Sequence, residues 1–340
     1  MGSRLLLFAV AFASLTLQQV ELPEGAWQAF PNTSVLDGWA RWDSAWYVEV
    51  ARSGYIDPAS LDPDEARNTA FFPLYPLVIA VFSMVSGDAF LAGIIVSNFC
   101  FLLSALVLYK LVCHREGEMV AFLAVCWWSL FPYSLFFSAV YPESLFMLLA
   151  LSSFLLVEQG RCVLGGSAAA LAGATSPFGL LLVPVLLLVR AGNEERSEFG
   201  GNRSDLGLLL GLLGPLAYIG FLWATYGNPL EFIAVQLVPE WVREVRLFPL
   251  NEPERILFVL FLSASAFLVT VRPMNGYAWW SLLVTTMSYW HLMAFGRLAL
   301  MAFPILVLLS SFRRAYWLLL PSTALLIWNT HQFAQWRWVG

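Results

Sequence analysis

The sequence predicts an all-helical protein that crosses a membrane about eleven times. Of its 340 residues, 59% are hydrophobic and only 12% are charged, whereas about a quarter of the residues in an average soluble domain carry a charge. The hydrophobic residues gather in long runs, and about 20 apolar residues suffice for one membrane-spanning helix. This composition excludes a water-soluble enzyme and a disordered chain. The net charge of −5 also excludes a polybasic surface for nucleic acid.

The prediction of about eleven spans rests on eleven apolar runs. We expect them to form one membrane domain over residues 1–340. Several runs are shorter than a full span, which a locally thinned bilayer accommodates. A further short run at 71–86 contains Pro73 and Pro76, and we expect it to be a re-entrant or interfacial helix. The eleven runs lie at about 4–20, 89–112, 119–140, 144–158, 162–175, 178–190, 206–224, 255–271, 277–294, 298–312 and 315–331.

Two long polar segments, 21–88 and 225–254, lie between the apolar runs. Short loops rich in Lys and Arg remain on the cytoplasmic side of a membrane, and an N-terminus on that side places most of the basic short loops there. Both long segments then lie outside, and together with Glu143 they account for 16 of the 23 acidic residues. If 71–86 spans the membrane instead, every later loop inverts.

The first apolar run has two interpretations. One is a signal peptide that is cleaved near Ala11-Phe12-Ala13, since Arg4 precedes the apolar stretch. The other, which we favour for a chain with so many further spans, is an uncleaved first helix.

The cysteines and acidic loop residues indicate neither a disulfide framework nor a metal site. None of the four cysteines belongs to a C-x-x-C pair, and all lie in or beside apolar segments, as expected of buried thiols. The acidic run of the first loop lacks the spacing of a calcium loop. It is either a solvated loop or a contact for an acceptor or cation. These residues are Cys100, Cys113, Cys126 and Cys162, and Asp57, Asp62, Asp64 and Glu65.

Residues 37–53 have the pattern of an amphipathic helix with an aromatic face, since Trp39, Trp42 and Trp46 recur every three to four residues. Asp43 lies at the edge of that face. It is too close in sequence to Arg41 to pair with it on a helix, and Asp37 is the better residue to cap the helix. We therefore expect Asp43 to point toward a bound molecule.

Glu143 in the stretch Tyr141-Pro142-Glu143-Ser144 lies between two apolar runs. An ionisable residue at such a boundary indicates a functional site. An ordinary turn, with the acid in the favourable first turn of the next helix, explains the residue equally well.

Three strings resemble the GPI mannosyltransferase 2 family and its bacterial relatives, which belong to the GT-C superfamily of membrane glycosyltransferases. They are RWDSAWYVEVARSGY at 41–55, NTAFFPLYPL at 68–77 and SAVYPESLF at 138–146, with weaker agreement at Tyr226-Gly227-Asn228-Pro229-Leu230 and Gly296-Arg297. The resemblance implies a GT-C helix bundle whose structured first external loop carries the catalytic residue. It also implies inverting transfer of a sugar, such as mannose, from a polyprenyl-phosphate donor to a lipid- or glycan-linked hydroxyl.

Under this resemblance Asp43 corresponds to the catalytic base, which takes the proton of the attacking hydroxyl. Arg297 is the candidate for the donor phosphate, since arginine binds phosphate in a bidentate manner; an arginine that extends from a helix end to the membrane surface is the alternative. His291 lies nearby. We expect no metal or cofactor, because a monophosphate leaving group needs little charge compensation. The expected substrate-binding residues are Arg41, Trp42, Tyr47, Tyr141, Glu143, Gln236, Trp241, Arg243 and Arg297.

One stretch departs from the family pattern. Relatives carry an arginine in the span that corresponds to 174–179, where this chain reads ATSPFG. Another GT-C transferase, for arabinose, glucose or an aminosugar, is therefore an alternative, and a lipid or sugar flippase is a second one. A flippase predicts polar residues at mid-membrane, whereas the acids here cluster at one face. We expect a multi-pass protein of a bacterial plasma membrane with its site on the extracytoplasmic face.

Overall fold

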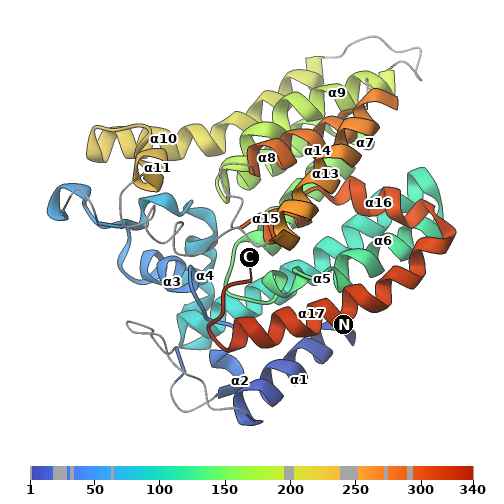
Figure 1. Ribbon diagram of the computed structural model, residues 1–340. Coiled ribbons are helices and arrows are strands. Elements are labelled where there is room, and N and C mark those ends of the chain that lie inside the picture. Colours follow the sequence, from blue (N-terminus) through green and yellow to red (C-terminus); the bar gives the residue numbers. More distant parts are fainter. Residues whose placement is uncertain are drawn as a thin grey trace.

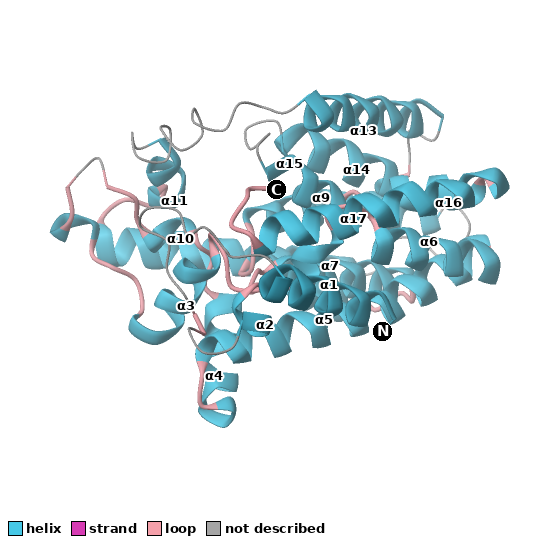
Figure 2. Ribbon diagram, turned by 60° about the horizontal axis from the view of Figure 1, so that its bottom comes forward, coloured by secondary structure: helices cyan, strands magenta, loops and turns pink. Residues whose placement is uncertain are grey.

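The computed structural model is all-helical over the residues that it describes (Figures 1 and 2). These residues are 2–17, 29–30, 34–62, 65–194, 203–237, 252–271, 275–288 and 294–339. The predicted fold class is therefore confirmed in its helical character.

The α-helices follow the apolar runs of the sequence closely. They are α1 (Gly2–Leu17), α2 (Ser34–Asp37), α3 (Ser44–Ser53), α4 (Leu74–Ser86), α5 (Ala89–Glu116), α6 (Glu118–Leu130), α7 (Glu143–Glu158), α8 (Cys162–Gly173), α9 (Leu182–Glu194), α10 (Leu213–Tyr226), α11 (Glu231–Ala234), α13 (Glu252–Val271), α14 (Gly276–Met287), α15 (Phe295–Leu298), α16 (Phe303–Ser311) and α17 (Leu319–Ala334). The long 3-10 helix η5 (Arg203–Leu212) runs directly into α10.

Two of these helical stretches are long and apolar enough to cross a membrane, Ala89–Glu116 and Asp205–Tyr226, within the described residues. Most other runs that we expected to span form apolar helices of 10–17 residues, so the count of about eleven full-length spans is not reproduced. The run 119–140 shows the reason. Its helix α6 ends at Leu130, and Phe131 is extended (φ −61°, ψ 143°) because a residue before proline avoids the helical conformation.

Two apolar cores organise the helices. One lies among α5, α6, α7, α8, α9, α14 and α16. The other joins α1, α3, α4, the first half of α5 and α17 around residues 135–145. In Figure 1, α1 and α17 run side by side along the lower edge; they are tied by Gln335, whose Nε2 donates to the Ser14 carbonyl oxygen at 2.7 Å.

An irregular connection, residues 131–142, lies buried between α6 and α7. Backbone groups without a helix partner are tolerated at such depth only where protein groups satisfy them. The buried Arg4 guanidinium donates to the carbonyl oxygens of Ser129 (2.8 Å) and Ser134 (2.7 Å), and Asn329 Nδ2 donates to that of Pro132 at 3.0 Å. These bonds fix the segment that carries Tyr141 and leads into Glu143.

The predicted amphipathic helix over 37–53 is wrong as a single element. The structure has α2, a turn over 38–43, and then α3, because Trp42 takes a left-handed conformation (φ 53°) that ends any helix. Trp39 is fully buried and does not share a helix face with Trp46.

The capping role predicted for Asp37 is also wrong. Asp37 ends α2 and accepts hydrogen bonds from the backbone N–H groups of Ala29 (2.8 Å) and Phe30 (3.1 Å). Its other carboxylate oxygen is 2.6 Å from Arg41 Nη1.

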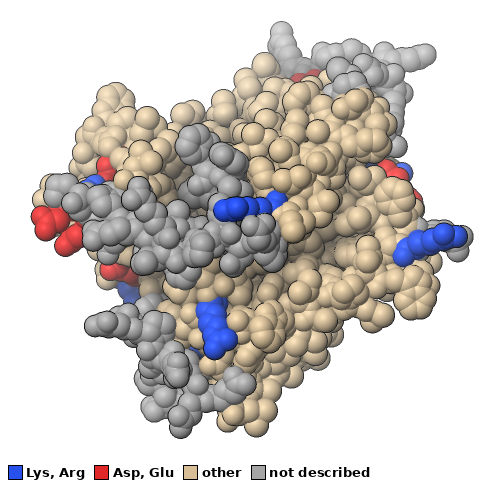
Figure 3. Space-filling view, viewed as in Figure 1, with Lys and Arg blue, Asp and Glu red and all other residues tan. Residues whose placement is uncertain are grey.

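The four cysteines are free thiols. Cys100 and Cys162 are buried, and Cys113 and Cys126 are half-buried. Among the residues coloured in Figure 3, few on the face shown are Lys, Arg, Asp or Glu. In the acidic run, Asp62 and Glu65 are exposed, and Asp57 caps a short 3-10 helix by accepting from Ala59 N at 3.0 Å.

Candidate functional site

Three charged side chains from distant parts of the chain meet at one place. Arg297 Nη1 is 2.8 Å from Asp43 Oδ2, and Arg297 Nε is 3.4 Å from Glu143 Oε1. The three residues come from the start of α3, the start of α7 and the short helix α15. The fold thus brings together the three residues that the sequence singled out as base, external acid and phosphate ligand.

The backbone around Asp43 aims its carboxylate at Arg297. Asp43 immediately precedes α3, but its side chain makes no capping bond to that helix. Its N–H donates to Tyr141 Oη at 3.2 Å, and the Tyr141 hydroxyl donates to the Arg41 carbonyl oxygen at 3.3 Å. This buried tyrosine holds the turn on both sides of the left-handed Trp42. A left-handed non-glycine residue costs roughly 1–3 kcal/mol and marks a place that the surroundings enforce.

Arg297 is enclosed by rings as well as by carboxylates. Its Cζ atom lies 5.1 Å from the ring centre of Tyr141, 5.8 Å from that of Phe136 and 6.0 Å from that of Trp338, distances at which a cation is attracted to a ring face. Burial alone would lower the pKa of Arg297, but Asp43 and Glu143 outweigh it and raise that pKa above its ordinary value. The guanidinium is therefore charged, and it points toward the two carboxylates.

The position of Arg297 beside the two carboxylates requires a glycine at position 296, because no side chain fits there. A Cβ atom there would lie 2.2 Å from Cε1 of Tyr133, well inside van der Waals contact. The ring of Tyr133 thus packs directly against the α15 backbone, which sets the position from which Arg297 reaches Asp43.

Glu143 is the most enclosed of the three charges. It is 3% exposed and lies just ahead of the apolar run 144–158. Burial raises the pKa of its carboxyl to about 7, with Arg297 opposing the shift and Asp43 adding to it. Its Oε2 atom has no hydrogen-bond partner among the described residues. Glu143 is also the first residue of α7, so the first-turn interpretation and the site interpretation both fit its position.

Three further expected site residues, Tyr47, Trp42 and Arg41, come from the same part of the chain as Asp43. Tyr47 packs edge-on against Phe71 and Tyr75, with ring centres 4.9 and 5.3 Å away. Trp42 lies beside the site. Arg41 is 1% exposed; besides its pair with Asp37, its Nη2 donates to the Ala334 carbonyl oxygen at 3.3 Å. Its charge is thus used within the protein, and we propose no substrate contact for it.

The second long polar segment, 225–254, is only partly described. Gln236 is half-buried in the short 3-10 helix η6 (Val235–Leu237), and no described contact joins it to Asp43, Glu143 or Arg297. Trp241, Arg243 and His291 lie outside the described residues.

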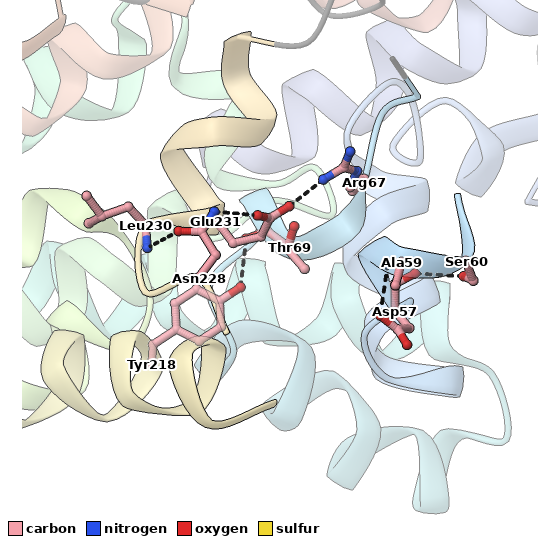
Figure 4. A network of polar contacts seen from close by, with 9 residues as sticks. All are labelled: Asp57, Ala59, Ser60, Arg67, Thr69, Tyr218, Asn228, Leu230 and Glu231. Atoms are coloured by element: carbon pink, nitrogen blue, oxygen red, sulfur yellow. Dashed lines mark hydrogen bonds and ion pairs between the residues drawn. The ribbon is translucent and has the colours of Figure 1, made fainter. Parts of the chain in front are cut away.

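A polar network that the sequence did not indicate joins the two long polar segments, 21–88 and 225–254, and the helix α10 between them (Figure 4). Arg67 Nη1 is 2.6 Å from Glu231 Oε1, and Asn228 Nδ2 donates to Glu231 Oε2 at 2.8 Å. The Tyr218 hydroxyl donates to the Thr69 carbonyl oxygen at 2.7 Å. The loop before α4 is thereby fixed to α10 and α11.

Two tryptophans after α17 also escaped the sequence analysis. Trp336 and Trp338 lie 5.7 and 5.4 Å from the Trp42 ring, both in edge-on contact. The only signal for them in the sequence is the alternation Trp336-Arg337-Trp338 in a polar stretch.

An apolar groove with a cavity volume of about 410 Å³ opens between α3, α4 and α10. Small residues leave the space for it, among them Ala51, Gly54, Ala80 and Ala217.

Comparison with known proteins connects these features to a family. The family model described as Mannosyltransferase (PIG-V) matches residues 13–193. A GPI mannosyltransferase 2 from Chaetomium globosum is 35% identical over 148 residues, covering 40% of this chain and 31% of the relative. A GPI alpha-1,6-mannosyltransferase 2 from Cricetulus griseus is 30% identical over 164 residues, covering 45% and 32%. The chain spans about a third of the length of these curated relatives.

Among solved structures, the oligosaccharyltransferase of Archaeoglobus fulgidus in its apo form aligns with 98% of this chain and 55% of that chain. The alignment has 12% sequence identity and a TM-score of 0.46.

The match to the PIG-V family model is long enough to assign the chain to that family. It covers more than half of the chain and includes both Asp43 and Glu143. This chain belongs to the PIG-V family of mannosyltransferases.

Proposed function

We propose that this protein transfers mannose from a polyprenyl-phosphate donor to a hydroxyl of a lipid- or glycan-linked acceptor, on the extracytoplasmic face of a bacterial plasma membrane. The observation that carries the proposal is the ion pair of Asp43 with Arg297, whose guanidinium also faces Glu143 at 3.4 Å. A base and a fixed cation side by side are what an inverting transfer from a phosphate requires.

In the proposed reaction Asp43 accepts the proton of the acceptor hydroxyl. The hydroxyl oxygen attacks the anomeric carbon of mannose from the side opposite the phosphate, and the bond between that carbon and the phosphate oxygen breaks. The electron pair leaves with the phosphate, and the configuration inverts.

Arg297 stabilises the departing phosphate. Its Nη1 is directed at Asp43, while its Nε has no hydrogen-bonded acceptor among the described residues. Charge-assisted bonds from a buried guanidinium to a phosphate are short and strong. Release of Asp43 from Arg297 as the phosphate binds would leave the carboxylate free to take the proton of the acceptor hydroxyl. A monophosphate needs no more than this compensation, so we assign no metal or cofactor.

The apolar groove between α3, α4 and α10 is the place that we propose for the polyprenyl chain, because its lining is apolar and it opens on the outer surface of the helices. Filling it with tryptophan at Ala217 or Ala80 should raise the KM for a long-chain donor. The KM for a donor with a single isoprenoid unit should stay the same.

The test of the function is transfer by the purified full chain in lipid nanodiscs, with polyprenyl-phosphate mannose and a lipid-linked glycan acceptor. Asp43→Asn should reduce kcat about 100-fold or more, which is the usual contribution of a general base. Asp88→Asn is the matched control, because this exposed acid caps α5 through Leu91 N and pairs with Arg52. Full activity of Asp43→Asn beside an active wild type would refute the proposed role.

A further inference from the structure

The chain reverses sharply where α17 ends, and the reversal is built on a tryptophan. Trp336 N donates to the Phe333 carbonyl oxygen at 3.1 Å, and Arg337 N donates to that of Gln332 at 2.9 Å. This pair of bonds is the usual helix-ending motif whose left-handed position is normally glycine. Here Trp336 occupies it with φ 61°, a conformation that is strained for a residue with a side chain.

The strained Trp336 contacts a second strained residue, Trp42. Trp42, at φ 53°, lies in edge-on contact with Trp336, and the Arg41 Cζ atom lies 4.8 Å from the Trp336 ring centre. These are the two non-glycine residues with positive φ in the described chain. Strain of this kind persists where the surroundings enforce it, which is characteristic of functional sites. Its effect here is to turn residues 337–339 back toward the site.

The turn places Trp338 between Trp42 and Arg297. Its ring centre is 5.4 Å from that of Trp42 at an interplanar angle of 85°, and the Arg297 Cζ atom is 6.0 Å from it. Phe136 and Tyr141, the other rings around Arg297, are fully buried. Trp338 is half-buried, so among these three rings it alone has surface for a ligand.

A second observation points to the same ligand. Glu143 Oε2 is buried beside Arg297 and has no hydrogen-bond partner among the described residues. A buried carboxylate oxygen without a donor is costly, and a hydroxyl group of a bound molecule would satisfy it. The site thus combines a cation, a free acceptor and a partly open aromatic ring.

We propose that Trp338 is the ring against which the transferred sugar stacks, with a sugar hydroxyl donating to Glu143 Oε2. The inference rests on the proposed function. The Trp338 ring centre is 6.0 Å from Arg297 Cζ, so a sugar joined through one oxygen to a phosphate held by Arg297 would be within reach of this ring. The C–H groups on one face of a pyranose carry a small positive charge, which suits the negative face of an indole.

The test compares two lipids on the purified full chain in nanodiscs: polyprenyl-phosphate mannose and the same polyprenyl phosphate without sugar. Wild type should bind the mannose-bearing lipid more tightly. Trp338→Leu, which keeps an apolar side chain but has no ring, should reduce that preference about tenfold, the scale of one aromatic contact. Its affinity for the sugar-free lipid should be unchanged.

Trp338→Phe should keep most of the preference because it keeps a ring. Trp328→Leu is the matched control, since Trp328 is 57% exposed on α17 and should behave as wild type. If wild type prefers the mannose-bearing lipid and Trp338→Leu retains that preference, the stacking role is refuted alone. If wild type neither distinguishes the two lipids nor transfers mannose, the proposed function fails, and the stacking role fails with it.

Discussion

Arg297 and Asp43 are 254 residues apart in the chain, yet their side chains meet at 2.8 Å. Both are largely enclosed, with side-chain exposures of 16% and 18%. In such a pair the two charges depend on each other, because removing either one leaves the other uncompensated in a poorly solvated place.

Loss of the two side chains should therefore be strongly non-additive. We expect Arg297→Gln and Asp43→Asn each to lower kcat/KM about 100-fold or more, and the double variant to lose little beyond either single one, as for residues that act as a unit. Arg297→Lys should recover only part of the activity, since lysine cannot bind a phosphate in a bidentate manner. Arg52→Lys, at an exposed pair, is the control. Losses that multiply in the double variant would show that the residues act independently.

Glu143 should make stability depend on pH in a defined direction. Its pKa is raised by burial to about 7, from an ordinary value of 4.5, although Arg297 opposes the shift. The folded state therefore holds this proton more tightly than the unfolded state. The resulting stabilisation is complete below about pH 4.5 and is lost as the pH rises through about 7.

The melting temperature of wild type minus that of Glu143→Gln should accordingly fall between pH 5 and pH 8, by the equivalent of roughly 3 kcal/mol at most. The comparison cancels groups that titrate in both proteins, and Arg297 stays charged throughout the range. A difference that rises with pH would contradict a raised pKa for Glu143.

Substitution of Gly296 should disturb the site without touching a charge. An alanine Cβ would collide with Tyr133 at 2.2 Å, so α15 must shift, and a displacement of about 1 Å at a catalytic group can cost roughly 100-fold in rate. We expect Gly296→Ala to lower kcat at least tenfold. Gly220→Ala is the control, because nothing lies within 4 Å of the added Cβ.

Removing the ring of Tyr133 should relieve this collision and restore activity. The double variant Gly296→Ala with Tyr133→Ala should recover activity relative to Gly296→Ala alone. If Gly296→Ala is as active as Gly220→Ala, then α15 does not need this close approach to Tyr133.

The Arg67–Glu231 pair should matter for stability far more than its exposed counterpart. The two side chains are 13% and 6% exposed, and breaking a buried pair costs about 3–5 kcal/mol. We expect Glu231→Gln to lower the melting temperature clearly and to reduce transfer, since α11 would lose its attachment to the segment that carries Arg67. Arg52→Gln should cost less than about 1 kcal/mol. Equal melting temperatures for the two variants would show that the network is dispensable.

The sequence was most informative about charge. Glu143 could be named because an acid between two apolar runs is conspicuous in a chain with so few charged residues. The roles of Asp43 and Arg297 were named from the family resemblance of the strings that contain them. Helix positions followed from the apolar runs, but helix lengths did not, because Phe131 and Pro132 interrupt a continuous apolar run without changing its composition.

The left-handed tryptophans could not be predicted. Trp42 and Trp336 adopt conformations that their own side chains disfavour, and only contacts between distant segments stabilise them. The same holds for Glu231, whose partner Arg67 is 164 residues away.

Arg4 has a consequence for the order in which the protein is made. Its guanidinium is bonded only to groups of residues 129–138, and to Ser3, within the described chain. Those distant acceptors lie more than a hundred residues further along the chain, so they are translated after Arg4. A buried arginine without its hydrogen-bond acceptors is costly. Helix α1 should therefore reach its final packed position only after residues 129–138 have been made.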